Sequence, residues 1–129
     1  MLFFRKAFIL NGKNMSVLAD RSYQFAIRIV KLNTYLQNEK KEYVLSKQLL
    51  RSGTAIGALI AEAQYAQSKA DFVNKLQISL KEANESKYWL RLLNDCQYLE
   101  ENIAQSMLQD VDALLKMLTS SINTTKEKR

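Results

Sequence analysis

Three glutamates are the residues whose spacing could bring carboxylates together. Glu62, Glu82 and Glu85 could lie near one another if the helices that carry them are antiparallel neighbours. Such a cluster could bind a metal ion, but a partly buried ion pair with lysine or arginine is the commoner arrangement. The chain contains no histidine, which removes the usual zinc, haem and di-iron ligand sets. We therefore expect neither a metal nor a cofactor.

Nucleophilic catalysis has little support in the sequence. Ser52, Thr54 and Cys96 have no histidine to activate them. The segment "SGTAIG", residues 52–57, lacks the lysine and the preceding strand of a phosphate-binding loop. Cys96 is the single cysteine, so no intramolecular disulfide can form, and a reducing, cytoplasmic setting is the default. We expect a protein that is not an enzyme, with lysine or carboxylate chemistry left open.

Basic residues outnumber acidic ones. Lysine and arginine total 19 and aspartate and glutamate 13, and residues 1–75 hold 12 of the basic and 5 of the acidic residues. A one-sided basic excess suits a polyanion such as nucleic acid, although ordinary solvated lysine is the plainer interpretation. Contacts would be directed at phosphates and sensitive to salt. The candidate contacts are Arg21, Arg28, Lys31, Lys40, Lys41, Lys47, Lys69 and Lys75.

Apolar residues recur every three or four positions in four segments, which predicts four amphipathic helices. The chain has no proline and three glycines, so long helices fit better than strands and their turns. We predict an all-α, up-down-up-down four-helix bundle. It occupies residues 15–124, with a flexible N-terminal extension at 1–14 and a flexible tail at 125–129. The stripes are Phe25, Ile29, Leu32 and Leu36; Leu45, Leu49, Ser52, Ile56, Leu59 and Ala63; Phe72, Leu76, Ser79, Ala83, Ser86, Leu90 and Leu93; and Ile103, Met107, Val111, Leu114, Leu118 and Ile122.

Helix ends are predicted from capping residues. Asp20 or Ser22 can cap the first helix, and Met15 is a candidate start residue because the helical pattern follows it. Ser68 and Asp71 in "SKAD" form a capping box for the third helix. No apolar run approaches the roughly 20 residues needed to cross a bilayer, so no membrane association is expected.

Two of the three glycines lie inside the second helix. Gly53 and Gly57 are four residues apart and Ala61 is four further on, so the three share one side of a helix. Each glycine costs a helix about 1 kcal/mol relative to alanine. We therefore expect this side to be buried in a close helix approach, either inside the bundle or at an oligomer interface.

The stretch "LLRSGTAIGALIAEAQYAQSKADFVNKLQISLKEANESKYWLRLL", residues 49–93, resembles the bacterial four-helix-bundle family first described from proteins encoded in intervening sequences of rRNA genes. The residues that carry the resemblance are Arg51-Ser52-Gly53-Thr54, Ile60-Ala61-Glu62-Ala63, Asp71-Phe72, Lys81-Glu82-Ala83 and Tyr88-Trp89-Leu90. Ala55 and Leu59 depart from the serine and asparagine common in the family. A binding site that used those polar groups would be altered here, whereas polar groups that only fixed helix packing would be replaced by a larger core.

The resemblance implies a bundle that forms homopentamers. It also implies a fold similar to the accessory factor of diversity-generating retroelements, a basic pentamer that works with a reverse transcriptase and nucleic acid. We thus expect a homo-oligomer that binds RNA or DNA, without deciding between them. The alternative is a scaffold that binds another protein.

Overall fold

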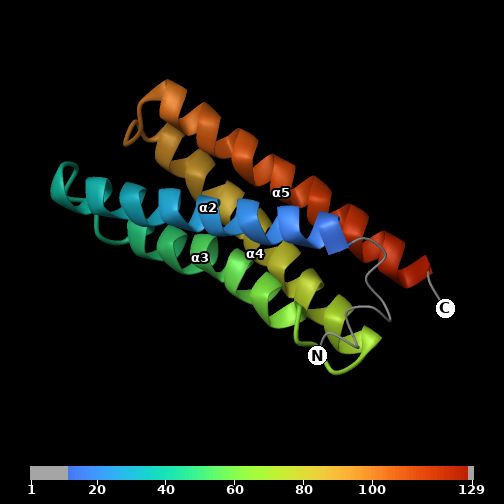
Figure 1. Ribbon diagram of the computed structural model, residues 1–129. Coiled ribbons are helices and arrows are strands. Elements are labelled where there is room, and N and C mark those ends of the chain that lie inside the picture. The colour runs from blue at the N-terminus through green and yellow to red at the C-terminus, as the bar shows by residue number, and fades with distance from the viewer. Residues whose placement is uncertain (1–11, 128–129) are drawn as a thin grey trace.

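The computed structural model describes residues 12–127, which form four α-helices joined by short loops. They are α2 (Gly12–Asn38), α3 (Leu45–Ala63), α4 (Lys69–Asp95) and α5 (Glu101–Glu127). The helices run alternately in opposite directions, and each packs on the next along the chain (Figure 1). The described residues contain no strand. The prediction of an all-α, up-down-up-down four-helix bundle is confirmed.

Most residues of the predicted stripes are buried in the core, which also includes residues outside the stripes such as Leu18 and Ile60. Phe25, Ile29, Phe72 and Leu76 are each 2% exposed or less, and the third stripe is buried along its whole length. Ile103 is the exception in the fourth stripe, because its side chain remains 38% exposed. It lies at the start of α5, beside a hollow between α5 and α2.

The loop before α3 is organised by a buried carboxylate. Glu42 is 8% exposed and accepts hydrogen bonds from the N–H groups of Val44, Leu45 and Ser46 at 2.7–3.1 Å. Burial opposes ionisation of this group, but the hydrogen bonds from Leu45, Ser46 and Val44 outweigh it and hold the pKa of Glu42 below its ordinary 4.5. The carboxylate therefore satisfies the first free N–H groups of α3.

The predicted caps have mixed outcomes. Ser68 caps α4 by accepting from Asp71 N at 3.0 Å, as expected, but the Asp71 carboxylate accepts from Gln67 N at 3.4 Å rather than from Ser68 N. The proposed caps Asp20 and Ser22 are wrong, because α2 begins at Gly12 and both residues lie inside it. The buried Ser22 hydroxyl donates instead to Ala19 O within the helix.

The helices extend past the predicted domain limits of 15 and 124. α2 begins at Gly12, and α5 continues to Glu127. Thr125 is buried, and its hydroxyl donates to Ser121 O at 2.7 Å, which holds this last turn in the helix. The rest of the expected flexible ends, residues 1–11 and 128–129, lies outside the described residues. Within residues 12–127 no helix combines the length and apolarity needed to cross a membrane.

Two glycines bring α3 close to α2. A Cβ on buried Gly53 would lie 2.7 Å from Ile29 Cγ1, and one on half-buried Gly57 would lie 3.3 Å from Ser22 O. Both contacts are with α2 of the same chain, so this approach is internal to the bundle. Ala61 is exposed in the single chain, so it takes no part in the close approach of α3 to α2, and its burial between subunits stays a prediction. Two steps of four residues rotate a helix position by about 80°, which carries Ala61 away from α2.

Candidate nucleic-acid interface

α2 presents a polar and basic stripe towards α5. Its positions alternate three and four residues apart, the spacing that places side chains along one side of a helix. A tightly closed bundle would fill such a stripe with apolar residues, but this one carries three cations and no acid. The stripe consists of Asn14, Val17, Arg21, Gln24, Arg28, Lys31 and Tyr35.

The facing side of α5 is mainly apolar. Ile103, Met107, Leu114 and Met117 follow the same spacing, interrupted by Asp110. We call the interface between α2 and α5 the α2–α5 seam, and use the same word for the other helix interfaces. Across it, Asp110 accepts a hydrogen bond from Arg28 at 2.5 Å, and this ion pair joins the two helices. Elsewhere the side chains meet less closely.

Packing between α2 and α5 is the sparsest of the four interfaces between neighbouring helices, and hollows remain along it. The first, which we call the α2–α5 groove, has a volume of about 390 Å³. It lies where α2 ends and α5 begins, and is lined by Arg28, Lys31, Leu32, Tyr35, Leu99, Glu100, Ile103 and Met107. A second hollow of about 250 Å³ adjoins it at Arg28 and includes Arg21 and Asp110. A third, of about 300 Å³, lies beside Asn14 and Lys116 near the other end of the seam.

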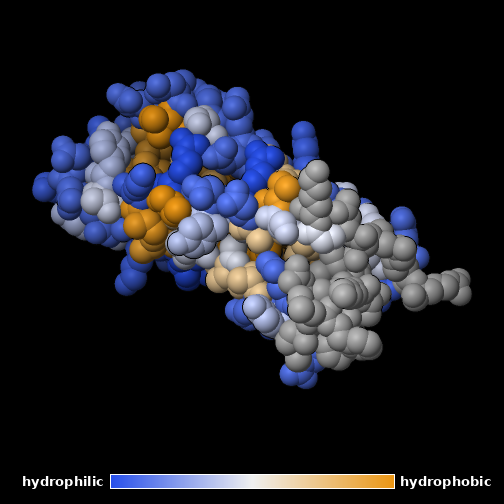
Figure 2. All heavy atoms as spheres, in the orientation of Figure 1, coloured by the Kyte–Doolittle hydropathy of each residue, from blue (hydrophilic) through white to orange (hydrophobic). Residues whose placement is uncertain are grey.

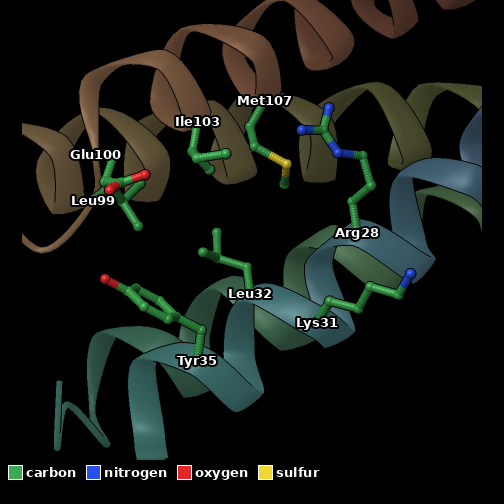
Figure 3. Close-up of a pocket in the computed structure, with 8 residues that line it drawn as sticks. All are labelled: Arg28, Lys31, Leu32, Tyr35, Leu99, Glu100, Ile103 and Met107. Atoms are coloured by element: carbon green, nitrogen blue, oxygen red, sulfur yellow. The ribbon is translucent and has the colours of Figure 1, made fainter. Parts of the chain in front are cut away.

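The two walls of the α2–α5 groove differ in character (Figure 3). α2 contributes Arg28 and Lys31 at one end and Tyr35 at the other, with Leu32 between them. The opposite wall comes from α5 and the preceding loop. In Figure 2 apolar atoms gather over this end of the molecule, surrounded by hydrophilic ones. The groove therefore combines an apolar surface with a cationic border.

The eight basic candidates do not form one surface. Arg28 and Lys31 line the groove, and Arg21 lines the adjoining hollow. The remaining candidates divide between the two ends of the bundle. Lys40, Lys41 and Lys47 lie in the α2–α3 loop and the first turn of α3, at the same end as the groove, whereas Lys69 and Lys75 lie in the first turns of α4 at the other end.

Most of these cations are not neutralised. Lys75 pairs with Glu62 at 3.5 Å and Arg28 with Asp110. The other six candidates make no ion pair within the described residues, although Arg21 contacts the Met117 sulfur at 3.9 Å. The basic excess is thus carried by side chains directed at solvent.

Sequence reasoning missed the apolar and aromatic members of the site. No pattern in the sequence singles out Tyr35 or Leu99, and the periodicity predicts Ile103 in the core. The available signal was the alternating spacing from Asn14 to Tyr35, which continues through α2 beside the core stripe and is almost free of aliphatic side chains. A polar stripe where a neighbouring helix is expected predicts an open seam.

The family follows from comparison with known proteins. The family model described as 23S rRNA-intervening sequence protein matches residues 14–120. The chain belongs to this family. A crystal structure from Bacteroides thetaiotaomicron VPI-5482, of a protein of unknown function in the S23 ribosomal protein family, is 52% identical. The match has a TM-score of 0.84 and covers 85% of this chain and 98% of that one. No curated protein matches the chain.

Several of the residues that carried the resemblance lie between α3 and α4, whereas Gly53 faces α2. Arg51 pairs with Glu85 and, at 3.5 Å, with Glu82. The indole N–H of Trp89 donates to Glu85 at 3.1 Å. This hydrogen bond, with the cations of Arg51 and Lys81, outweighs burial and holds the pKa of Glu85 below its ordinary 4.5. The glutamates considered for a metal site are thus engaged in ion pairs, including Glu62 with the α4 lysine described above.

Small polar side chains complete the same seam. The Ser86 hydroxyl lies 3.0 Å from that of Ser52, and Ser79 donates to Ile56 O at 2.9 Å, so two hydrogen bonds join α3 to α4 inside the core. Ala55 and Leu59, which replace the polar residues common in the family, are half-buried on α3. Ion pairs and buried serine hydrogen bonds therefore hold α3 and α4 together, away from the α2–α5 groove.

Proposed function

We propose that this protein is a non-enzymatic, homo-oligomeric bundle that binds RNA or DNA through exposed basic side chains in the cytoplasm. The observation that carries the proposal is that six of the eight candidate cations form no ion pair with any residue in 12–127. Such cations release counterions when they contact phosphates, which drives binding without sequence readout. The family name, which refers to intervening sequences of 23S rRNA, supports a link to nucleic acid.

The assembly is part of the proposal. The resemblance to pentameric accessory factors of retroelements suggests a homopentamer in which each subunit repeats the same weak contact. Linked contacts raise the overall affinity through effective concentration. Light scattering coupled to size-exclusion chromatography measures the subunit number, and a monomer at concentrations at which nucleic acid binds would contradict this part.

The binding test is a salt series with fluorescent RNA and DNA. Charge reversal at Lys40 and Lys41 should weaken binding and flatten its dependence on salt. The matched control reverses Lys81 and Arg91, which are exposed on α4 and change the net charge equally. Absence of binding by the unmodified protein at low salt, or equal losses in both variants, would refute binding through these candidates.

A second candidate function is a scaffold for another protein. Tyr43 and Val44, just before α3, are 56% and 70% exposed, and exposed apolar side chains of this kind favour protein contacts. A scaffold would retain its partner at salt concentrations that release nucleic acid.

A further inference from the structure

The α2–α5 groove is amphipathic across its width. Its α2 wall carries the cations Arg28 and Lys31, and its opposite wall carries apolar Ile103 and Met107. Ile103 is 38% exposed although it belongs to the main apolar stripe of α5. A ligand that matches both walls must have anionic groups along one edge and flat or apolar groups along the other.

Single-stranded nucleic acid has this arrangement. Its phosphates suit a cationic border, and its unstacked bases offer apolar faces that stack on aromatic side chains. Lys31 makes no ion pair among residues 12–127. Arg28 uses one nitrogen for Asp110 and keeps other N–H donors, with its side chain 36% exposed. The bases of a duplex are paired and stacked and could not reach the groove floor.

The charge of the groove disfavours two other occupants. A second copy of this chain has a net charge of +6 and would bring more cations than acids to this border, so the proposed self-association would use other faces. Residues 1–11 of the chain itself include Arg5 and Lys6 and no acid. Both would place like charges together, whereas phosphates neutralise the α2 wall.

The end of the groove opposite the cations has groups suited to a base. Tyr35 is 36% exposed and offers a ring for stacking. Glu100 lies at the same end on the other wall (Figure 3), and a carboxylate accepts hydrogen bonds from an exocyclic amino group such as that of cytosine. Uracil has a carbonyl at that position and would face the carboxylate with another acceptor.

We infer that the α2–α5 groove binds a base of single-stranded nucleic acid, with Tyr35 stacking on the base, Lys31 and Arg28 holding adjacent phosphates and Glu100 favouring an amino-bearing base. The inference rests on the proposed nucleic-acid function and assigns it a site and a preference for single strands.

The experiment compares labelled oligocytidylate and oligouridylate of about 16 nucleotides, the upper end of single-strand site sizes, with an RNA duplex of equal length. Both single strands should bind more tightly than the duplex, and oligocytidylate more tightly than oligouridylate. Tyr35→Ala should lose about 5- to 150-fold in single-strand affinity, the range for one stacked base. Tyr35→Phe should retain it. Tyr65→Ala, at an exposed tyrosine between α3 and α4, is the control and should bind normally.

Two further variants test the polar contacts. Lys31→Ala should reduce the slope of log affinity against log salt by about 0.7, the value for one phosphate of a single strand, and Lys81→Ala on α4 should not. Glu100→Gln should reduce the preference for cytidine over uridine. Circular dichroism melting of each variant confirms that the bundle is intact.

The outcomes separate this inference from the broader function. No single-strand or duplex binding by the unmodified protein refutes both. Salt-sensitive binding that Tyr35→Ala and Lys31→Ala leave unchanged, or binding that favours the duplex, overturns the groove inference alone. Hydroxyl-radical footprinting adds an independent reading. Tyr35 protected only when RNA is present supports the inference, and Tyr35 already protected in the free protein overturns it, because a second copy or another part of the chain then occupies the groove.

Discussion

A single methyl group at Gly53 should test how α2 and α3 fit together. Its carbon would lie 2.7 Å from Ile29 Cγ1, 2.9 Å from Cδ1 and 3.0 Å from Cγ2, whereas carbon atoms prefer about 3.5–4.0 Å. Ile29 is fully buried, and its branched side chain has one strongly preferred helical rotamer, so it cannot turn aside. Overpacking of this kind costs about 1–3 kcal/mol.

Gly53→Ala also gains helix propensity, which offsets part of that cost. The gain is about 1 kcal/mol, so we expect a net destabilisation of about 0–2 kcal/mol. Ala58→Gly is the control, because Ala58 is exposed in the same helix and reports the propensity difference alone. Urea unfolding followed by circular dichroism, at one fixed protomer concentration, measures each free energy.

A double-mutant cycle that combines Gly53→Ala with Ile29→Ala isolates the contact between these two positions. Ile29→Ala removes all three atoms that the new methyl group would meet, so in that background Gly53→Ala should stabilise by about 1 kcal/mol. The change in the free energy of unfolding caused by Gly53→Ala should therefore differ by about 1–3 kcal/mol between the wild-type and the Ile29→Ala backgrounds. If Gly53→Ala raises the free energy of unfolding in both backgrounds by as much as Ala58→Gly lowers it, then Gly53 has no packing role.

Three other perturbations follow from the structure. Gly57→Leu should lower the free energy of unfolding by about 1–3 kcal/mol without changing the subunit number in light scattering, because the Ser22 backbone it would strike belongs to the same chain. Glu42→Gln should cost about 1 kcal/mol near neutral pH through loss of the charged cap. Because the native pKa of Glu42 lies below 4.5, the wild-type advantage should be complete above pH 4.5 and disappear as pH falls through the native pKa; an advantage in urea unfolding that persists in acid would refute this. Asn33→Leu should raise the melting temperature, since Asn33 Oδ1 is buried without a hydrogen-bond partner, and a lower temperature would indicate an unrecognised partner.

The sequence was sufficient for the fold because periodicity reports burial directly. The stripes of Phe25 and Phe72 are core residues throughout, since a helix must bury one side to be stable. Periodicity does not report how tightly two helices close on each other. Ile103 therefore fitted the stripe of α5 but lies beside a hollow. The cap at Glu42 was also missed, because a glutamate in a polar connection looks the same whether it is solvated or folded back onto α3.

The candidate site was harder to predict than the bundle. Charge counting identified Arg28 and Lys31, but it grouped them with Lys69 and Lys75, which lie at the far end. A net charge contains no information on position, and only the pairing of helices decides which lysines share a surface. Tyr35 could not be ranked above the other exposed tyrosines until α5 was placed opposite it.

The uneven packing of the four seams also bears on how this family can diverge. Substitutions along α2 at Arg21, Arg28 or Lys31 alter few buried contacts, so they change stability little. Changes between α3 and α4 disturb hydrogen bonds inside the core and therefore cost more stability. If the α2–α5 groove binds a ligand as inferred, its side chains can therefore change with little effect on the packing that holds the bundle together.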